Sequence, residues 1–380
     1  MLRTLRTATA VAAVFAAAQA HAAEYEVEIL AEGLDRPWGM SFLPGSEDIL
    51  ITGRNGTLML WDASAGSIVD IDGAPEVDNS GQGGLLDIEP APDFAETGHV
   101  FMTWVAQVEG GSTTTLGRGT FDRDAGALSD VEVLFQVSPG IESGGHFGSR
   151  IVIQGDHIFV GTGDRNFKDF GPDHIAQDRT SENGAVVRLR LDGSVPDDNP
   201  FVDDSDASPA IWSYGHRNIQ ALAARPGTDE LWLAEHGESG GDEINILERG
   251  GNFGWPLAHF GVDYRTGEPF ANPPSEGDGF VTPVFAWGPG RDDNFPPSGM
   301  AWVDGSAFAD WEGHLLVGNL RHQYLGLFEV SGQEVSEPTR LLEDRGWRIR
   351  DVAIGPEDGF IYVIVDGEDV PLVRLRPASD

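Results

Sequence analysis

One histidine, His146, stands among small residues just before two short apolar runs, residues 151–153 and 158–160. A Gln-Gly-Asp turn at residues 154–156 separates the runs, so the sequence predicts an antiparallel hairpin. Asp164 follows the second run. Because both ends of a hairpin lie on the same edge of a sheet, His146 and Asp164 are expected to be neighbours. A carboxylate beside an imidazole can orient a general base, although an unrelated loop histidine and turn aspartate would give the same pattern.

The pattern of two apolar runs joined by a turn occurs six times, and a third strand is plausible after each pair. The pairs are residues 38–43 and 49–51, 85–88 and 100–102, 151–153 and 158–160, 219–223 and 231–233, 300–303 and 315–317, and 352–354 and 361–364. With 50 Gly, 23 Pro and no long helical pattern, this predicts an all-β six-bladed β-propeller of four-stranded antiparallel blades. A β-sandwich or a β-helix is the structural alternative.

The composition restricts the partners of the chain. It has 62 acidic and 24 basic residues, a net charge of −38, so we expect neither nucleic acid nor anionic lipid as a partner. No later stretch is long and apolar enough for membrane insertion. The chain lacks cysteine, so we expect core burial and a closed architecture to stabilise it without disulfides.

The first 22 residues have the features of a secretory signal peptide. Two arginines precede an alanine-rich apolar segment, and Ala20-His-Ala22 resembles a cleavage site. We therefore expect a periplasmic or secreted protein in which residues 23–380 form one propeller domain, as a monomer or homodimer.

Propeller topology predicts which polar residues share a face. The loops that enter the first strand and leave the second strand of each blade open on one side. The residues so placed are Gln82, His146, Asp164, Arg217, Asn218, Gly237, Glu238, Arg321, Arg348 and Arg350. Four arginines on one rim of an acidic chain predict a pocket for an anion with several carboxylates or phosphates. The alternative is that each arginine pairs with a nearby acid such as Glu343, Asp344 or Asp351.

Several stretches resemble the soluble PQQ-dependent sugar dehydrogenases, with the aldose sugar dehydrogenases as the most similar branch. They are residues 81–86 (GQGGLL), 146–150 (HFGSR), 192–201 (DGSVPDDNPF), 214–218 (YGHRN), 235–245 (EHGESGGDEIN), 251–256 (GNFGWP) and 348–352 (RIRDV). The resemblance spans nearly all of the chain after the signal segment. It implies a six-bladed propeller that binds pyrroloquinoline quinone (PQQ), a cofactor with three carboxylates, and oxidises an aldose at C1 to the lactone.

The resemblance also implies residue roles. His146 would remove the proton from the C1 hydroxyl, Asp164 would orient His146, and Arg217 would stabilise charge on the quinone oxygen. The implied cofactor contacts are Gln82, His146, Arg217, Asn218, Arg321, Arg348 and Arg350. Electrons would then pass to an external acceptor.

Calcium is implied as a second cofactor. The backbone carbonyls of Gly237 and Glu238 would hold Ca²⁺ on the quinone, where it would act as a Lewis acid. A second Ca²⁺ is suggested at Glu243, the Phe253 carbonyl and Asp263. Ordinary surface acids would explain those positions equally well.

Three departures from the family pattern concern the pocket. Glu238 replaces a frequent proline, Arg321 replaces a lysine of some members, and Gly145 replaces an aspartate of the glucose-specific branch. Substrate range is expected to depend on the long loops 165–183 and 260–297. These contain Gln177 and Trp287, and the tryptophan could either lie beside a sugar ring or be buried.

Two other function classes remain open. A calcium-dependent lactonase of the six-bladed type would need several carboxylates on the axis, whereas this rim is rich in arginine. A propeller without catalytic activity that only binds sugars or partners would not need both His146 and the arginines.

Overall fold

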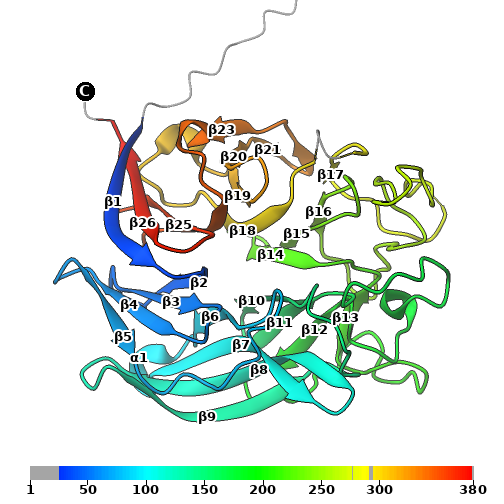
Figure 1. Cartoon of the computed structure of the whole chain (residues 1–380), viewed down its shortest axis with the longest axis horizontal. Helices are drawn as coiled ribbons and strands as arrows, with labels where there is room; N and C mark the ends of the chain where they lie inside the picture. Colours follow the sequence, from blue (N-terminus) through cyan, green and yellow to red (C-terminus); the bar gives the residue numbers. More distant parts are fainter. Residues whose placement is uncertain (1–24, 276, 291–293, 379–380) are drawn as a thin grey trace, which may run out of the picture.

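The computed structural model describes residues 25–378 apart from 276 and 291–293. Six four-stranded antiparallel sheets surround a common axis, and the chain passes through them in order (Figure 1). In the first five blades the strands lie in sequence order from the inner strand outward, and in the sixth the outermost strand is β1. The predicted six-bladed β-propeller is therefore confirmed.

The first three blades contain the following strands. Blade 1 has β2 (Pro37–Phe42), β3 (Ile49–Gly53), β4 (Leu58–Asp62) and β5 (Ser67–Ile71). Blade 2 has β6 (Leu85–Pro90), β7 (His99–Val108), β8 (Gly111–Asp122) and β9 (Ala127–Gln136). Blade 3 has β10 (Gly148–Gln154), β11 (His157–Thr162), β12 (Ala185–Arg190) and β13 (Ile211–Tyr214).

The last three blades follow the same plan. Blade 4 has β14 (Ile219–Ala224), β15 (Leu231–Glu235), β16 (Glu243–Ile246) and β17 (Phe285–Ala286). Blade 5 has β18 (Pro297–Trp302), β19 (Leu315–Asn319), β20 (Tyr324–Phe328) and β23 (Thr339–Leu341). Blade 6 has β24 (Ile349–Ile354), β25 (Ile361–Val365), β26 (Val370–Pro377) and β1 (Tyr25–Leu34).

The connections carry little regular structure. They contain α1 (Phe94–Thr97), the 3₁₀ turns η1 (Ile175–Gln177), η2 (Ala309–Trp311) and η3 (Glu343–Arg345), and the hairpin β21 (Val330–Ser331) and β22 (Glu334–Val335). No helix in the described ranges is long and apolar enough to cross a membrane. The predicted signal peptide, residues 1–22, lies outside the described residues.

The ring is closed by strands from opposite ends of the described chain. β1 pairs antiparallel with β26, and Figure 1 shows the two side by side. A circular fold needs such a joint, because no covalent bond links the last blade to the first. The repeat pattern predicted the blades but not this pairing.

The hydrophobic core is divided among the blade interfaces. Six clusters of buried side chains lie one between each pair of neighbouring blades. Inner strands such as β3, with the sequence ILITG, are buried on both faces. This packing explains why the sequence shows apolar runs rather than strict alternation.

Each innermost strand carries a register shift near its beginning, at residues 37–40, 85–88, 148–151, 219–221, 297–300 and 349–351. Bulges of this kind re-aim side chains and bend the strand. Here they place the Arg150 guanidinium on the axis, with one nitrogen 2.9 Å from both Asp87 and Asp351. This buried ion cluster ties blades 2, 3 and 6 together.

Candidate active site

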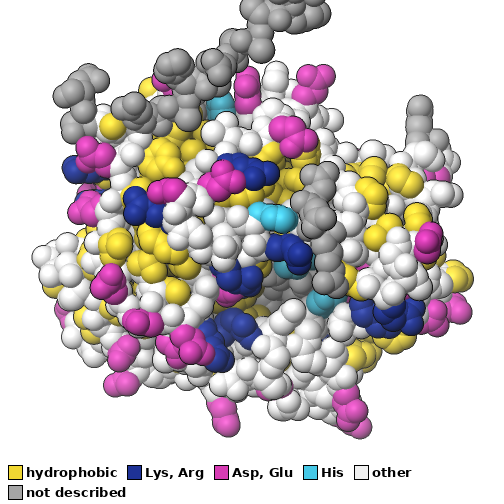
Figure 2. Space-filling view, turned by 45° about the horizontal axis from the view of Figure 1, so that its top comes forward, with side chains coloured by type: hydrophobic (Ala, Val, Ile, Leu, Met, Phe, Trp, Pro, Cys, Tyr) yellow, Lys and Arg dark blue, Asp and Glu magenta, His cyan; other side chains and the backbone are white. Residues whose placement is uncertain are grey.

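Two cavities lie side by side on the face where the predicted rim residues gather (Figure 2). The first has a volume of about 340 Å³ and the second about 500 Å³. Gln82, His236, Tyr264 and Pro296 line both, so the two form one continuous depression. In Figure 2, basic and histidine side chains surround the hollow in the middle of this face.

His146 lies in the second cavity and is bonded to Asp164 as the sequence predicts. His146 Nδ1 is 2.6 Å from Asp164 Oδ1. Since a carboxylate accepts a hydrogen bond, Nδ1 carries the proton and Nε2 has the free lone pair. Asp164 Oδ2 accepts a second bond from Trp255 Nε1 at 2.8 Å. The carboxylate is therefore fixed at both oxygens.

The backbone of His146 is held in an unusual conformation. Its φ of +52° lies in the left-handed region, which non-glycine residues seldom adopt. Gln82 Oε1 accepts from His146 N at 2.8 Å, and Arg165 N donates to His146 O at 3.3 Å. These contacts from two blades keep the imidazole at the cavity wall.

The electrostatic surroundings favour neutral imidazole. Burial lowers the pKa of His146, and the positive charges of Arg217 and Lys168 act in the same direction. The negative charge of Asp164 and its hydrogen bond act to raise the pKa of His146, but the net shift is downward. His146 is thus an unprotonated base at neutral pH, ready to accept a proton at Nε2.

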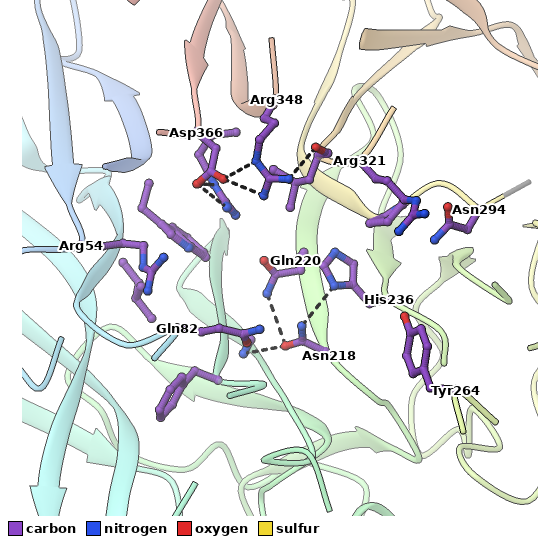
Figure 3. A pocket seen from close by; sticks show the side chains of 17 residues that line it. Arg54, Gln82, Asn218, Gln220, His236, Tyr264, Asn294, Arg321, Arg348 and Asp366 are labelled. Atoms are coloured by element: carbon purple, nitrogen blue, oxygen red, sulfur yellow. Dashed lines mark hydrogen bonds and ion pairs between the residues drawn. The ribbon is translucent and has the colours of Figure 1, made fainter. Parts of the chain in front are cut away.

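Arginines form the wall of the first cavity (Figure 3). Arg348 and Arg350 both pair with Asp366 at 2.8 Å. Although burial acts to raise the pKa of Asp366, the two arginines hold it at about 2. The acids named in the alternative interpretation bind elsewhere: Glu343 to Arg340, Asp344 to Arg345 and Asp351 to Arg150. Those named partners are therefore wrong, but the alternative holds in its general form for three of the four predicted arginines, since Arg348 and Arg350 pair with Asp366 and Arg217 pairs with Glu238.

The remaining arginines add uncompensated charge. Arg321 is exposed at the cavity and forms no ion pair within the described residues. Arg54 comes from blade 1, where its side chain donates to the carbonyls of Gly81 and Gly83. The charged lining groups are therefore four guanidinium groups against one carboxylate, a net +3, in a chain of net charge −38. Such a cavity is suited to a compound with several carboxylates.

Arg217 lies in the second cavity with His146. Its Nη2 is 2.6 Å from Glu238, and Lys168 Nζ lies 3.2 Å from the same carboxylate. Arg217 Nε is buried and lacks a hydrogen-bond partner in the described part of the chain. A buried N–H without a partner is costly, so this donor is suited to an anionic ligand atom.

Neutral polar groups join the two cavities. Asn218 Oδ1 accepts from Gly148 N at 3.2 Å, and its Nδ2 lies 3.5 Å from His236 Nδ1. His236 Nε2 donates to the Pro297 carbonyl at 2.7 Å. Burial lowers the pKa of His236 to about 3, so it contributes no charge.

The predicted metal-binding residues are brought together only in part. Gly237 and Glu238 line the second cavity. Glu243 and Phe253 line a smaller cavity that shares Arg217, His236 and Gly237 with the second one. Asp263 pairs with Arg265 at 2.9 Å and lines neither cavity. Among the residues that the structure describes, no three His, Asp or Glu side chains are grouped to hold a metal ion.

Two loop residues pack rather than face the cavities. Trp287 is buried and stacks on Phe295 with ring centroids 4.5 Å apart, in the core between blades 4 and 5. Trp287 lines neither of the two main cavities, so of the two interpretations the structure favours the buried one. Gln177 Nε2 donates to the Trp255 carbonyl at 2.7 Å and bonds Asn252, so it supports the loop that carries Trp255.

The amino-acid sequence was compared with known protein families. Residues 34–374 match the family model described as glucose/sorbosone dehydrogenase. The chain belongs to the glucose/sorbosone dehydrogenase family. It is 39% identical over 362 residues to aldose sugar dehydrogenase YliI of Escherichia coli, covering 94% of each chain.

Solved structures of family members agree. The apo form of the soluble aldose sugar dehydrogenase of E. coli has a TM-score of 0.87 at 37% identity, covering 93% of this chain and all of that one. The PQQ-bound aldose sugar dehydrogenase of Streptomyces coelicolor has a TM-score of 0.75 at 28% identity, covering 93% and 98%. The predicted family resemblance is thus confirmed.

The sequence analysis did not predict four residues of this site, namely Arg54, Lys168, Trp255 and Asp366. Arg54 directly follows β3 and Asp366 directly follows β25, so each leaves the second strand of its blade. The topological rule applied to the other rim residues would have found both. Lys168 and Trp255 lie in long loops, where no strand register signals their position.

Proposed function

We propose that the protein is a PQQ- and calcium-dependent aldose sugar dehydrogenase that oxidises the sugar at C1 to the lactone. The observation that carries this proposal is the cavity of net charge +3 adjoining a neutral, carboxylate-bound His146. The net charge matches the three carboxylates of PQQ. The unpartnered Arg217 Nε offers a further donor to an anionic group.

The residues of the chain divide into binding and proton transfer. Arg54, Arg321, Arg348 and Arg350 would hold carboxylates through charge-assisted hydrogen bonds. When bound, PQQ would accept the hydride that leaves C1 of the sugar. His146 Nε2 takes the proton of the C1 hydroxyl, so the sugar loses a hydride and a proton and becomes the lactone. Asp164 holds the imidazole and stabilises its positive charge after the transfer.

Calcium would bind at the loop that follows β15. The carbonyl oxygens of Gly237 and Glu238 belong to residues that line the second cavity, and oxygen is the donor that Ca²⁺ prefers. The ion would supply Lewis acidity beside Arg217. We propose Glu243 and the Phe253 carbonyl for a second ion, and not Asp263, because Asp263 pairs with Arg265.

The remaining proposals concern cellular context. Residues 1–22 are proposed to direct export to the periplasm or medium, leaving one catalytic domain. The reduced enzyme is proposed to pass its electrons to an external acceptor, as a monomer or homodimer.

Reconstitution tests the function. The apoprotein is mixed with PQQ, Ca²⁺, an aldose and a dye acceptor, with each component omitted in turn. We expect dye reduction only when all are present, and we expect His146→Ala to lower kcat by about 10²–10⁴-fold. Dye reduction without PQQ, or lactone hydrolysis without an acceptor, would reject the proposal. PQQ and sugar binding without dye reduction would favour the non-catalytic alternative.

A further inference from the structure

Trp255 is built into the site although it lines neither of the two main cavities. It lies in the loop after β16 and is 4% exposed. Its Nε1 donates to Asp164 Oδ2 at 2.8 Å, while Asp164 Oδ1 accepts from His146 Nδ1 at 2.6 Å. Trp255, Asp164 and His146 therefore form a continuous chain of hydrogen bonds.

The indole is held from several sides. Trp255 N donates to the Gly215 carbonyl at 2.9 Å, and Gln177 Nε2 donates to the Trp255 carbonyl at 2.7 Å. Phe170 and Phe270 contact its ring edge-on, with centroid separations of 5.5 and 5.9 Å. The ring is thus positioned by the two long loops, and its N–H direction is fixed by packing.

The same ring faces the cationic side of the site. The Arg217 guanidinium lies 5.2 Å from the indole centroid, within the range of cation–π attraction. One side chain therefore contacts both the carboxylate that orients the base and the arginine beside the base.

Asp164 Oδ2 has a second, weaker neighbour. His174 Nδ1 accepts from Ala176 N at 3.2 Å, so the proton of His174 is on Nε2, which bonds Phe167 O at 3.3 Å and lies 3.6 Å from Asp164 Oδ2. His174 cannot replace Trp255 as the principal donor, because its proton is directed mainly to Phe167. Without the indole N–H, Asp164 loses its strong bond at Oδ2.

We propose that Trp255 is a positioning residue that fixes Asp164 and sets the basicity of His146. A hydrogen bond stabilises the charged form of a carboxylate and so weakens its attraction for the proton of its partner. With Oδ2 bonded to Trp255, Asp164 presents only Oδ1 to the imidazole and keeps Nε2 aimed into the second cavity. The inference rests on the proposed role of His146 as the base.

Substitution of Trp255 leaves the other charges around His146 in place. The groups that act on the imidazole are Asp164, Arg217, Lys168 and His236, with His174 beside Asp164. Trp255→Phe retains an aromatic ring against Phe170 and removes the N–H donor, part of the ring area and part of the contact with Arg217. Trp311→Phe is the matched control, because Trp311 is also 4% exposed but stacks on Phe308 in the core between blades 5 and 6.

Two measurements test the inference. In ¹³C-histidine NMR titrations of the apoprotein, we expect His146 to titrate at higher pH in Trp255→Phe than in the wild type or Trp311→Phe. In the reconstituted enzyme, we expect the acid limb of the kcat profile to move in the same direction. We also expect kcat at its plateau to fall by about tenfold or more while KM changes little. A purely structural role would lower stability without moving either profile.

The wild-type protein provides a test that needs no variant. The indole N–H resonance of Trp255 should shift with the same midpoint as the His146 ring. The inference would be overturned if His146 titrated at the same pH in Trp255→Phe as in the wild type. It would also be overturned if the indole N–H resonance of the wild type did not shift as His146 titrates. A wild type without quinone-dependent oxidation would instead reject the proposed function, while the NMR result on the apoprotein would still stand.

Discussion

Arg321 and Arg350 line the same cavity, but their contacts within the protein differ, so only one of the two substitutions should change the stability of the apoprotein. Arg321 is exposed and has no ion pair within the described residues, so it is available to a ligand. Arg350 is buried and lies 2.8 Å from Asp366. We expect Arg321→Met to weaken cofactor binding without loss of stability, and Arg350→Met to destabilise the apoprotein.

The magnitudes follow from the contacts. A hydrogen bond to a charged group contributes about 1.5–3 kcal/mol, so Arg321→Met should raise the Kd for PQQ about 10- to 150-fold. Its free energy of unfolding should change by no more than about 0.5 kcal/mol, as for other surface sites. The pKa of Asp366, lowered from 3.8 to about 2, corresponds to about 2 kcal/mol at neutral pH. Because Arg348 remains, Arg350→Met should cost about 1–2 kcal/mol.

The pH dependence provides an internal check. The pKa of Asp366 is lower in the folded protein, so its contribution is present above about pH 4 and disappears as the pH falls toward 2. The stability difference between wild type and Arg350→Met should therefore shrink over that range. Arg321→Met should show no such dependence.

The assay combines calorimetric titration of the apoprotein with PQQ and denaturant unfolding without it. Lys at position 321 is the matched control, because Arg321→Lys keeps the charge and should recover much of the affinity. A Kd within twofold of wild type for Arg321→Met would refute the assignment of this cavity to the cofactor. A loss of stability in Arg321→Met would refute the description of its side chain as uncommitted.

Four further predictions concern other parts of the site and the axis. Asp164→Asn should lower kcat by about 10²-fold or more, because an amide cannot accept from both His146 and Trp255; steady-state kinetics would check this. Since burial and Arg217 lower the pKa of His146, activity should persist at pH 6.5 and fall only below it, which a pH–rate profile would show. Chelation with EDTA should abolish dye reduction, and Ca²⁺ should restore it, whereas a metal-independent rate would contradict the calcium proposal. Arg150→Met should cost about 3–5 kcal/mol of unfolding free energy, because Asp87 and Asp351 would be left buried without their cation.

The topological part of the site could be read from the sequence. His146 precedes β10 and Asp164 follows β11, so a local hairpin brings them together whatever the rest of the fold. The same rule placed Gln82, Arg217 and Arg321 at the cavities, and it would also have placed Arg54 and Asp366. These predictions succeed because strand order and turn position are encoded by nearby residues.

Pairings between residues that lie far apart in the chain were harder to predict from the sequence. The alternative interpretation named Glu343, Asp344 and Asp351 as partners of the rim arginines, yet Asp366 pairs with both Arg348 and Arg350. Sequence proximity is a poor guide here, because β24 and β25 run antiparallel and bring residue 366 back to the start of β24. The sequence left open whether Trp287 lies beside a sugar ring or is buried, and the core between blades 4 and 5 encloses it.

The sequence by itself determined the number of blades, their strands and the face on which the chemistry lies, since apolar runs, turns and strand order are local properties. Only the tertiary structure decided that β1 closes the ring, that Trp255 reaches Asp164, and that His146 is neutral. Those features depend on burial and on contacts between residues far apart in the chain, and neither is encoded at a single position.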